Sequence, residues 1–276
     1  MHALPFLLAL AGALVLAPML LRALSAGGPC RANFRERALP FPFGVLVPAA
    51  GLIALIPLTL LARLGSVEVF HSETVPIAIY ALGVLALGLI DDTLGETRAH
   101  RGWRGHGAAV LRGELSTGAL KAAGSLGLAL YAMSYLPLSK GRWLLAAAVL
   151  VLATNAFNLL DLRPGRASKV FVALGAGLGI GSGSARTLWA LGLFAAPALV
   201  AGFYDLRERA MLGDTGANLL GALAGLWLVL TLSGTGQLVA LALLLALSIY
   251  GELRSISELI ERTPWLRGLD SLGRPS

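Results

Sequence analysis

The chain is poor in charge, cysteine and histidine, and each shortage excludes a class of protein. Charged residues make up 13% of the 276 residues, whereas a soluble domain carries about 25%. A single cysteine, Cys30, excludes an intrachain disulfide. The four histidines lack cysteine partners and ligand spacing, which argues against a zinc site. The sequence shows no repeat, low-complexity tract or soluble second domain.

Hydrophobic residues are abundant instead, at 57% of the chain. Apolar runs long enough to cross a bilayer recur from one end to the other. They predict an all-α fold, a polytopic transmembrane helical bundle of about nine spans within residues 1–251. The predicted spans are 3–21, 41–62, 75–90, 117–135, 142–160, 170–183, 188–204, 215–231 and 237–251.

Basic residues are concentrated in alternate loops, which predicts the orientation of the chain in a membrane. Seventeen of the 22 Lys and Arg residues lie in the segments 22–40, 91–116, 161–169, 205–214 and 252–276. Because basic residues collect in cytoplasmic loops, these segments are predicted to face the cytoplasm. The membrane also accounts for the net charge of +7, so no nucleic-acid partner is expected. Thirteen of the 15 acidic residues share this side, although the orientation rule does not require it.

The tail, residues 252–276, is predicted to lie in the cytoplasmic interface of the membrane. Its apolar residues alternate with charges, as in an amphipathic segment, and they are Ile256, Leu259, Ile260, Trp265, Leu266 and Leu269. Asp270, an acid within this tail, is predicted to be dispensable for activity.

Two carboxylates, Asp91 and Asp92, end the third predicted span. They stand at the negative end of a helix, where carboxylates are unfavourable unless a cation offsets them. Neighbouring carboxylates at a membrane boundary suit Mg²⁺, which shares them with substrate phosphates. A solvated helix end is the plainer interpretation. Lys121 lies one turn into the fourth predicted span, where it either reaches out to the interface or neutralises a phosphate.

Two further polar groups interrupt apolar spans at the same predicted depth. Asn155, Asn158 and Asp161 end the fifth span at a spacing that spreads them over part of one helix surface. They either form a site or hydrogen-bond neighbouring helices. The run 213–216, Gly-Asp-Thr-Gly, precedes the eighth span. Asp214 there is either an ordinary N-cap or part of a phosphate or metal site at the helix N-terminus.

These motifs together resemble a known family. The matching segments are Asn-Phe-Arg-Glu-Arg (33–37), Leu-Gly-Leu-Ile-Asp-Asp (87–92), Gly-His (105–106), Gly-Glu-Leu-Ser-Thr-Gly-Ala-Leu-Lys (113–121), Asn-Ala-Phe-Asn-Leu-Leu-Asp (155–161) and Gly-Asp-Thr-Gly-Ala-Asn-Leu-Leu-Gly (213–221). In order and loop placement they resemble the polyprenyl-phosphate N-acetylhexosamine-1-phosphate transferases. That family includes the enzyme that makes the first lipid intermediate of peptidoglycan and the one that starts many surface polysaccharides.

The resemblance implies a reaction and a set of partners. In that family a nucleotide-activated amino sugar, usually UDP-linked, gives its sugar-1-phosphate to a polyprenyl phosphate at the cytoplasmic face of the bacterial plasma membrane. UMP leaves, and Mg²⁺ is the cofactor. The sequence leaves the oligomeric state open, with a homodimer among the options.

The resemblance also implies roles for individual residues. Asp91, Asp92 and Asp161 would be the catalytic carboxylates, and Asp214 with Asp92 would hold Mg²⁺. Substrate-binding residues would be Lys121, Asn155, Asn158, Asn33 and His106. All of these carboxylates are expected to converge on one Mg²⁺–phosphate site.

The chain departs from the family in two places that bear on substrate recognition. The family continues its Asn/Asp motif as Asp-Gly-x-Asp-Gly, whereas Leu162-Arg163-Pro164-Gly165 follows Asp161 here, and no histidine follows His106. Two alternatives to an enzyme therefore remain open. One is a non-catalytic relative that binds a polyprenyl phosphate, and the other is a small cation-coupled transporter. A transporter should place its carboxylates near the membrane midplane, not at one surface.

Overall fold

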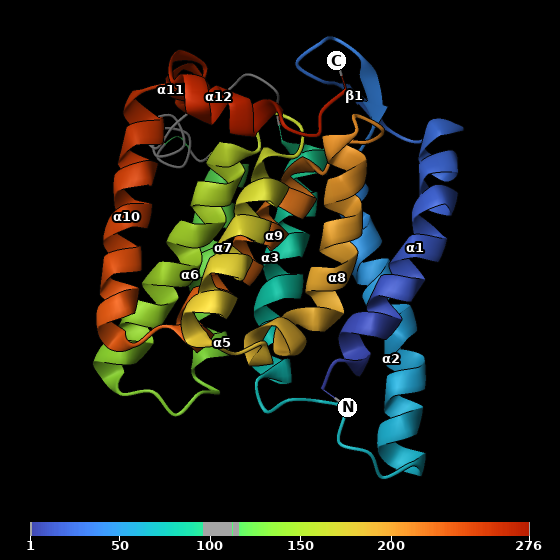
Figure 1. Cartoon of the computed structure of the whole chain (residues 1–276), viewed down its shortest axis with the longest axis vertical. Coiled ribbons are helices and arrows are strands. Elements are labelled where there is room, and N and C mark those ends of the chain that lie inside the picture. The colour runs from blue at the N-terminus through green and yellow to red at the C-terminus, as the bar shows by residue number, and fades with distance from the viewer. Residues whose placement is uncertain (1, 96–111, 113–115, 276) are drawn as a thin grey trace.

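The structure is a computed structural model that describes residues 2–95, 112 and 116–275. Its helices stand side by side in one bundle, with the two chain termini at opposite ends (Figure 1). The bundle helices are α1 (Leu4–Ser25), α2 (Leu46–Leu64), α3 (Thr74–Leu94), α5 (Thr117–Met133), α6 (Lys140–Leu160), α7 (Arg166–Ser182), α8 (Arg186–Leu206), α9 (Gly213–Thr231) and α10 (Gly234–Leu253). The all-α prediction therefore agrees with the structure.

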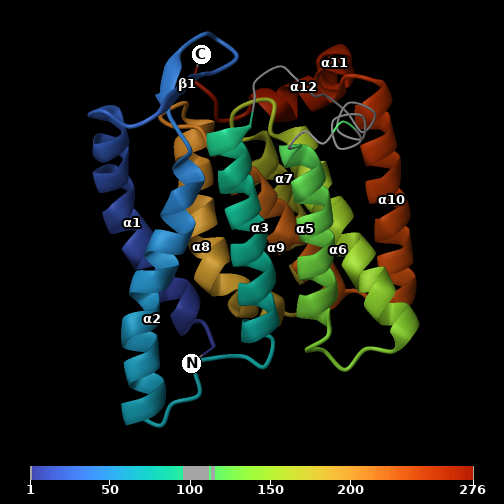
Figure 2. The same ribbon diagram turned by 180° about the vertical axis from the view of Figure 1, so that it is seen from behind.

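Smaller elements cover one end of this bundle. A hairpin of β1 (Cys30–Ala32) and β2 (Ala38–Pro40) follows α1, and a 3-10 turn, Phe43–Val45, leads into α2. Two short helices, α11 (Ile256–Arg262) and α12 (Pro264–Ser271), follow α10 and run across the same end (Figure 2). The tail is therefore helical and does not continue α10 as a further span.

The prediction of nine spans is wrong. Within the described residues, seven helices are long and apolar enough to cross a membrane: α1, α2 with its leading turn, α3, α6, α8, α9 and α10. The predicted spans 117–135 and 170–183 correspond to α5 and α7, which have 17 residues each. At 1.5 Å per residue such a helix is about 25 Å long, shorter than the roughly 30 Å hydrocarbon core. The seven helices that are long and apolar enough to cross a membrane indicate an integral membrane protein.

Helix α9 is the centre of the bundle. Of its most apolar stretch, 89% is buried, against 22% for α1 and 17% for α10. Glycines allow this burial because neighbouring helices approach closely where α9 has no side chain. A Cβ at Gly221 would lie 2.6 Å from Thr154 Cα, and one at Gly225 would lie 3.1 Å from Leu150 Cα, both in α6. Small residues at helix contacts are typical of membrane bundles.

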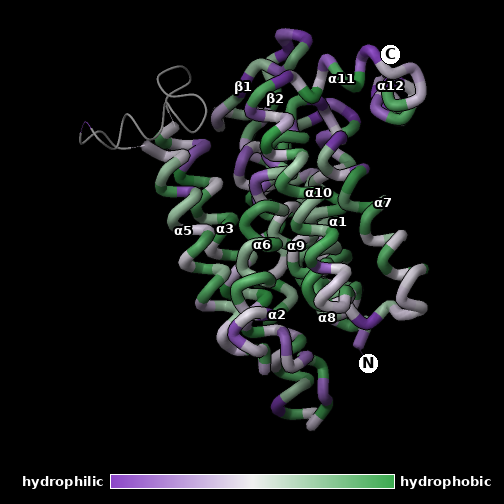
Figure 3. Tube along the Cα trace, turned by 90° about the vertical axis from the view of Figure 1, so that its left-hand side faces the viewer, coloured by the Kyte–Doolittle hydropathy of each residue, from purple (hydrophilic) through white to green (hydrophobic). Residues whose placement is uncertain are grey.

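Polar residues gather at the end where α9 begins. Figure 3 shows hydrophobic residues through the middle of the bundle and hydrophilic residues concentrated near β1, β2, α11 and α12. The hairpin is fastened to the segment before α9, since Met211 N–H donates to Pro40 O at 2.9 Å and Phe43 N–H donates to Met211 O at 2.7 Å. This end, called the polar end below, carries the loops 22–40, 161–169 and 205–214 and the tail.

Candidate functional site

Three charged side chains from three helices meet at the polar end. The Lys121 ammonium of α5 lies 2.8 Å from Asp91 Oδ2 of α3 and 2.5 Å from Asp214 Oδ2 of α9. The three side chains are 18–30% exposed, so a solute can reach them from the polar end. The Asp91 and Asp214 carboxyl groups also lie next to each other. Two carboxylates therefore share one ammonium.

Asp92 has a different task from its neighbour. Its Oδ1 accepts a hydrogen bond from Asp214 N–H at 2.9 Å, and its Oδ2 accepts from Thr215 N–H at 2.8 Å and Thr215 Oγ1 at 2.6 Å. A carboxylate from α3 thus caps the N-terminus of α9, where free N–H groups and the helix dipole favour an anion. The capping role that the sequence offered to Asp214 belongs to Asp92.

Glycines make this cap possible. A Cβ at Gly88 of α3 would lie only 2.4 Å from Asp214 O, so this residue lets the two backbones touch beside the carboxylates. Gly213 has a φ of 72°, a left-handed conformation that favours glycine, and a Cβ there would lie 2.6 Å from Asp92 Oδ2. The Gly-Asp-Thr-Gly motif is therefore needed first for close contact between helices.

Asp161 ends α6 close to this cluster. Its burial, together with the negative charges of Asp205, Asp214 and Asp92, raises the pKa of its carboxyl group well above the usual range. Asp92 and Asp214 thus act electrostatically on Asp161, and Lys121 contacts Asp91 and Asp214.

Asp205 is a further buried carboxylate that the sequence analysis missed. Its Oδ2 accepts a hydrogen bond from Gly165 N–H at 2.6 Å, and its Oδ1 accepts from Leu212 N–H at 3.4 Å. It thereby ties the end of α8 to the loop after Asp161 and to the segment before α9. The available signal was an acid at the end of an apolar helix, the same signal that identified Asp91.

Within the described part of the chain, Asn155 and Asn33 form hydrogen bonds outside the cluster. Asn155 Nδ2 donates to Ser248 Oγ of α10 at 3.1 Å, which agrees with the helix-bridging interpretation. Asn158 is half-buried one turn before Asp161. Asn33 organises the hairpin turn and donates to the buried Glu208 carboxylate at 3.1 Å. His106 lies outside the described residues.

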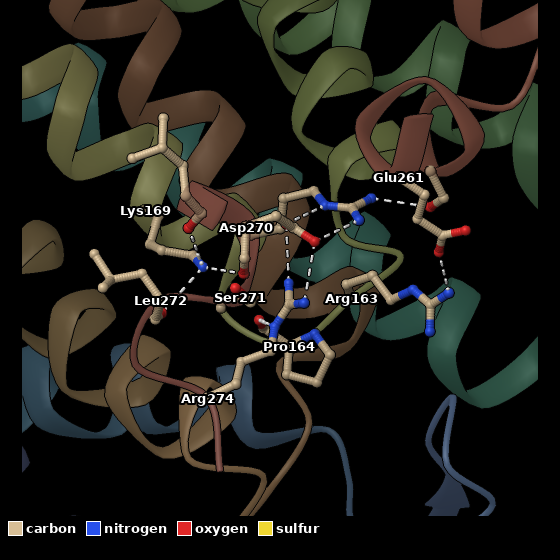
Figure 4. Close-up of polar contacts among 12 residues, drawn as sticks. Arg163, Pro164, Lys169, Glu261, Asp270, Ser271, Leu272 and Arg274 are labelled. Carbon is tan, nitrogen blue, oxygen red and sulfur yellow. Dashed lines mark hydrogen bonds and ion pairs between the residues drawn. The ribbon is translucent and has the colours of Figure 1, made fainter. Parts of the chain in front are cut away.

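The tail is clamped onto the loop that follows Asp161 (Figure 4). Arg166 holds Asp270 with two hydrogen bonds of 2.7 and 3.0 Å, and Arg274 binds the same carboxylate while donating to Pro164 O at 2.7 Å. Lys169 donates to backbone carbonyls at the end of α12. The Arg166 side chain is only 4% exposed. Asp270 therefore holds the tail against this loop, and its predicted dispensability for activity stays a prediction.

The cluster offers carboxylate ligands of the kind that bind Mg²⁺ together with a substrate phosphate. Among the described residues, no three His, Cys, Asp or Glu side chains are placed to hold one metal ion, which disfavours a metal held by protein ligands alone. Mg²⁺ is usually held by one or two carboxylates together with waters and substrate phosphates. Asp91 and Asp214 can supply these two carboxylates, whereas both Asp92 oxygens already accept hydrogen bonds from α9.

No protein-family model and no curated protein matches this chain. The residues of the cluster and the resemblance of the motifs are therefore the observations that bear on function.

Proposed function

We propose that this protein transfers a sugar-1-phosphate from a nucleotide-linked amino sugar, such as a UDP-sugar, to a polyprenyl phosphate in the membrane. The observation that supports this most is the Asp91–Lys121–Asp214 cluster at one end of a membrane bundle. A phosphate lipid and a soluble nucleotide sugar can meet only at such a boundary. In this proposal the polar end faces the cytoplasm of a bacterial cell.

Each member of the cluster has a role in the proposed reaction. Lys121 binds a phosphate oxygen of the substrates, and Asp91 and Asp214 would hold Mg²⁺, which supplies charge neutralisation for phosphoryl transfer. This revises the expected metal ligands, because Asp92 serves as the cap that positions Asp214. In this proposal Asp161 and Asn158 lie beside the nucleotide of the sugar donor.

The proposed chemistry is a single phosphoryl transfer. An oxygen of the polyprenyl phosphate attacks the phosphorus that carries the sugar, and a new P–O bond forms. The bond from that phosphorus to the bridging oxygen of the nucleotide breaks, and UMP leaves with the electron pair. Such reactions depend mainly on positioning and charge neutralisation. An ammonium and two carboxylates held by three packed helices suit this requirement.

The test is direct. The purified protein in nanodiscs is incubated with Mg²⁺, undecaprenyl phosphate and a panel of radiolabelled UDP-sugars, and the lipid product and UMP are measured. Asp214→Asn should abolish turnover while the protein still inserts and folds. Glu68→Gln, which removes an exposed acid at the opposite end, is the matched control and should keep full activity. Turnover by Asp214→Asn equal to that of the native protein contradicts the proposal.

A non-catalytic binder of polyprenyl phosphate is the second candidate. It is favoured by the loop 161–165, whose Pro164 replaces the second Asp of the family motif and is hydrogen-bonded to Arg274 of the tail. A binder retains undecaprenyl phosphate through Lys121 but releases no UMP with any sugar nucleotide. The same nanodisc assay distinguishes the two candidates.

A further inference from the structure

A second feature lies at the membrane-facing side of α7, away from the carboxylates. A groove of about 470 Å³ runs between α7, α8 and α9. Apart from Ser184 at one end, its walls are apolar or glycine, and they include Phe171, Gly175, Gly179, Leu199 and Trp227. Helix α7 stands at the edge of the bundle (Figure 3).

Glycines give the groove its depth. A Cβ at Gly175 would lie 2.6 Å from the Trp227 ring, so the indole forms the floor directly against the α7 backbone. Toward the other end, no described atom lies within 4 Å of a Cβ placed at Gly179 or Gly183. The groove is therefore open near the end of α7 at Gly179 and Gly183.

The length of the groove and its apolar lining suit a single hydrocarbon chain. From Phe171 to Gly183 the lining residues of α7 cover about 18 Å of helix length. This length is close to the roughly 15 Å hydrocarbon depth of one leaflet.

The groove ends at a polar cavity. This cavity of about 210 Å³ shares Ser184 with the groove and is also lined by Glu73, Arg186, Thr187 and Thr231. Arg186 Nη2 lies 2.7 Å from Glu73 Oε1, while Glu73 Oε2 is buried with no hydrogen-bond partner among the described residues. The cavity thus presents a guanidinium and hydroxyl groups beside a carboxylate.

We propose that the groove and cavity together bind one phospholipid with a primary-amine headgroup, at the end of the bundle opposite the Asp91–Lys121–Asp214 cluster. One acyl chain lies in the groove. The headgroup phosphate meets the Arg186 guanidinium, and the headgroup ammonium donates to the Glu73 carboxylate, whose side chain is 15% exposed. The complementarity is specific, because a choline headgroup has no N–H to donate and a glycerol headgroup has no positive charge. This inference is independent of the proposed function.

The test measures lipid retention by native mass spectrometry. The full chain is exchanged into detergent with equal amounts of phosphatidylethanolamine, phosphatidylcholine and phosphatidylglycerol of the same acyl chains. One phosphatidylethanolamine should remain bound. Gly179→Leu fills the groove, and Arg186→Gln removes the phosphate partner. Each should weaken retention by about tenfold or more, the effect of losing one charge-assisted contact or one buried chain segment.

Matched controls keep this outcome interpretable. Gly177→Leu is on the same helix, has equally open space around its Cβ and does not line the groove. Arg63→Gln removes an exposed cation at the same end of the bundle. Both controls should retain the lipid, and leucine should not harm either helix position, because it has a higher helix propensity than glycine. Equal retention of all three lipids, or equal loss with Gly177→Leu, overturns the proposal. A cross-linker at Val172 that captures only a protein partner also overturns it.

Discussion

Asp92→Asn should destabilise the protein more than any other single amide substitution in the carboxylate cluster. The native side chain accepts three hydrogen bonds, of 2.9, 2.8 and 2.6 Å, from the first turn of α9. Asparagine keeps one acceptor oxygen, turns an NH₂ group toward donors and removes the negative charge from a helix N-terminus. Loss of a cap costs about 0.5–2 kcal/mol and loss of a charge-assisted hydrogen bond about 1.5–3 kcal/mol. Because these effects overlap, we expect a loss of about 2–4 kcal/mol.

Asp214→Asn is the matched comparison at the same helix end. The Asp214 side chain accepts a hydrogen bond from Lys121, which also keeps its contact with Asp91, and it lies next to the Asp91 carboxyl group. We therefore expect this variant to lose less than about 1 kcal/mol of stability, in the range of a partly exposed ion pair. Both variants are unfolded by SDS titration in mixed micelles, and the free energies of unfolding are compared. An Asp214→Asn variant that is less stable than Asp92→Asn refutes the division of labour between the two carboxylates.

Three further predictions concern the contacts around the cluster and the tail. Gly88→Ala must displace α3 from the Asp214 backbone by about 1 Å and should lower the proposed turnover by about 100-fold. The control Gly83→Ala meets only the flexible end of a leucine side chain and should be nearly neutral. Equal rates for the two variants would contradict the close approach of α3 to α9. Lys121→Met leaves two adjacent carboxylates without their ammonium, so the melting temperature in EDTA should fall, and Mg²⁺ should restore it. A melting temperature that does not change with Mg²⁺ would count against the metal site. Burial alone would raise the pKa of Asp270, but hydrogen bonds from two arginines outweigh burial and hold the pKa at about 2. Since the pKa in the unfolded chain is about 4, the stabilisation by this carboxylate is complete above pH 4 and is lost as the pH falls toward 2. A spin label in α12 should become mobile over that interval and not near neutral pH.

The sequence located the cluster but not the roles within it. Asp91, Asp92, Lys121 and Asp214 stood out because charges interrupt apolar runs at one predicted depth. Which carboxylate caps a helix and which holds a lysine depends on how α3 lies against α9. That contact is governed by Gly88, whose importance has no local signal.

Other features were out of reach for similar reasons. The partners in the tail clamp, Arg166 and Asp270, are 104 positions apart, and no periodic pattern links them. The number of spans was overestimated because the apolar stretches 117–135 and 170–183 were counted as spans, although their helices have only 17 residues each. The helix at 166–182 ends because Gly183 adopts a left-handed conformation, with a φ of 62°.

The clamp between Arg166 and Asp270 has a consequence for how the protein is made. Arg166 is synthesised 104 residues before its carboxylate partner. In the finished structure the arginine is 4% exposed, and a buried charge that lacks its partner costs about 3–5 kcal/mol. We therefore expect the loop after Asp161 to reach its final packing only once α12 has been synthesised.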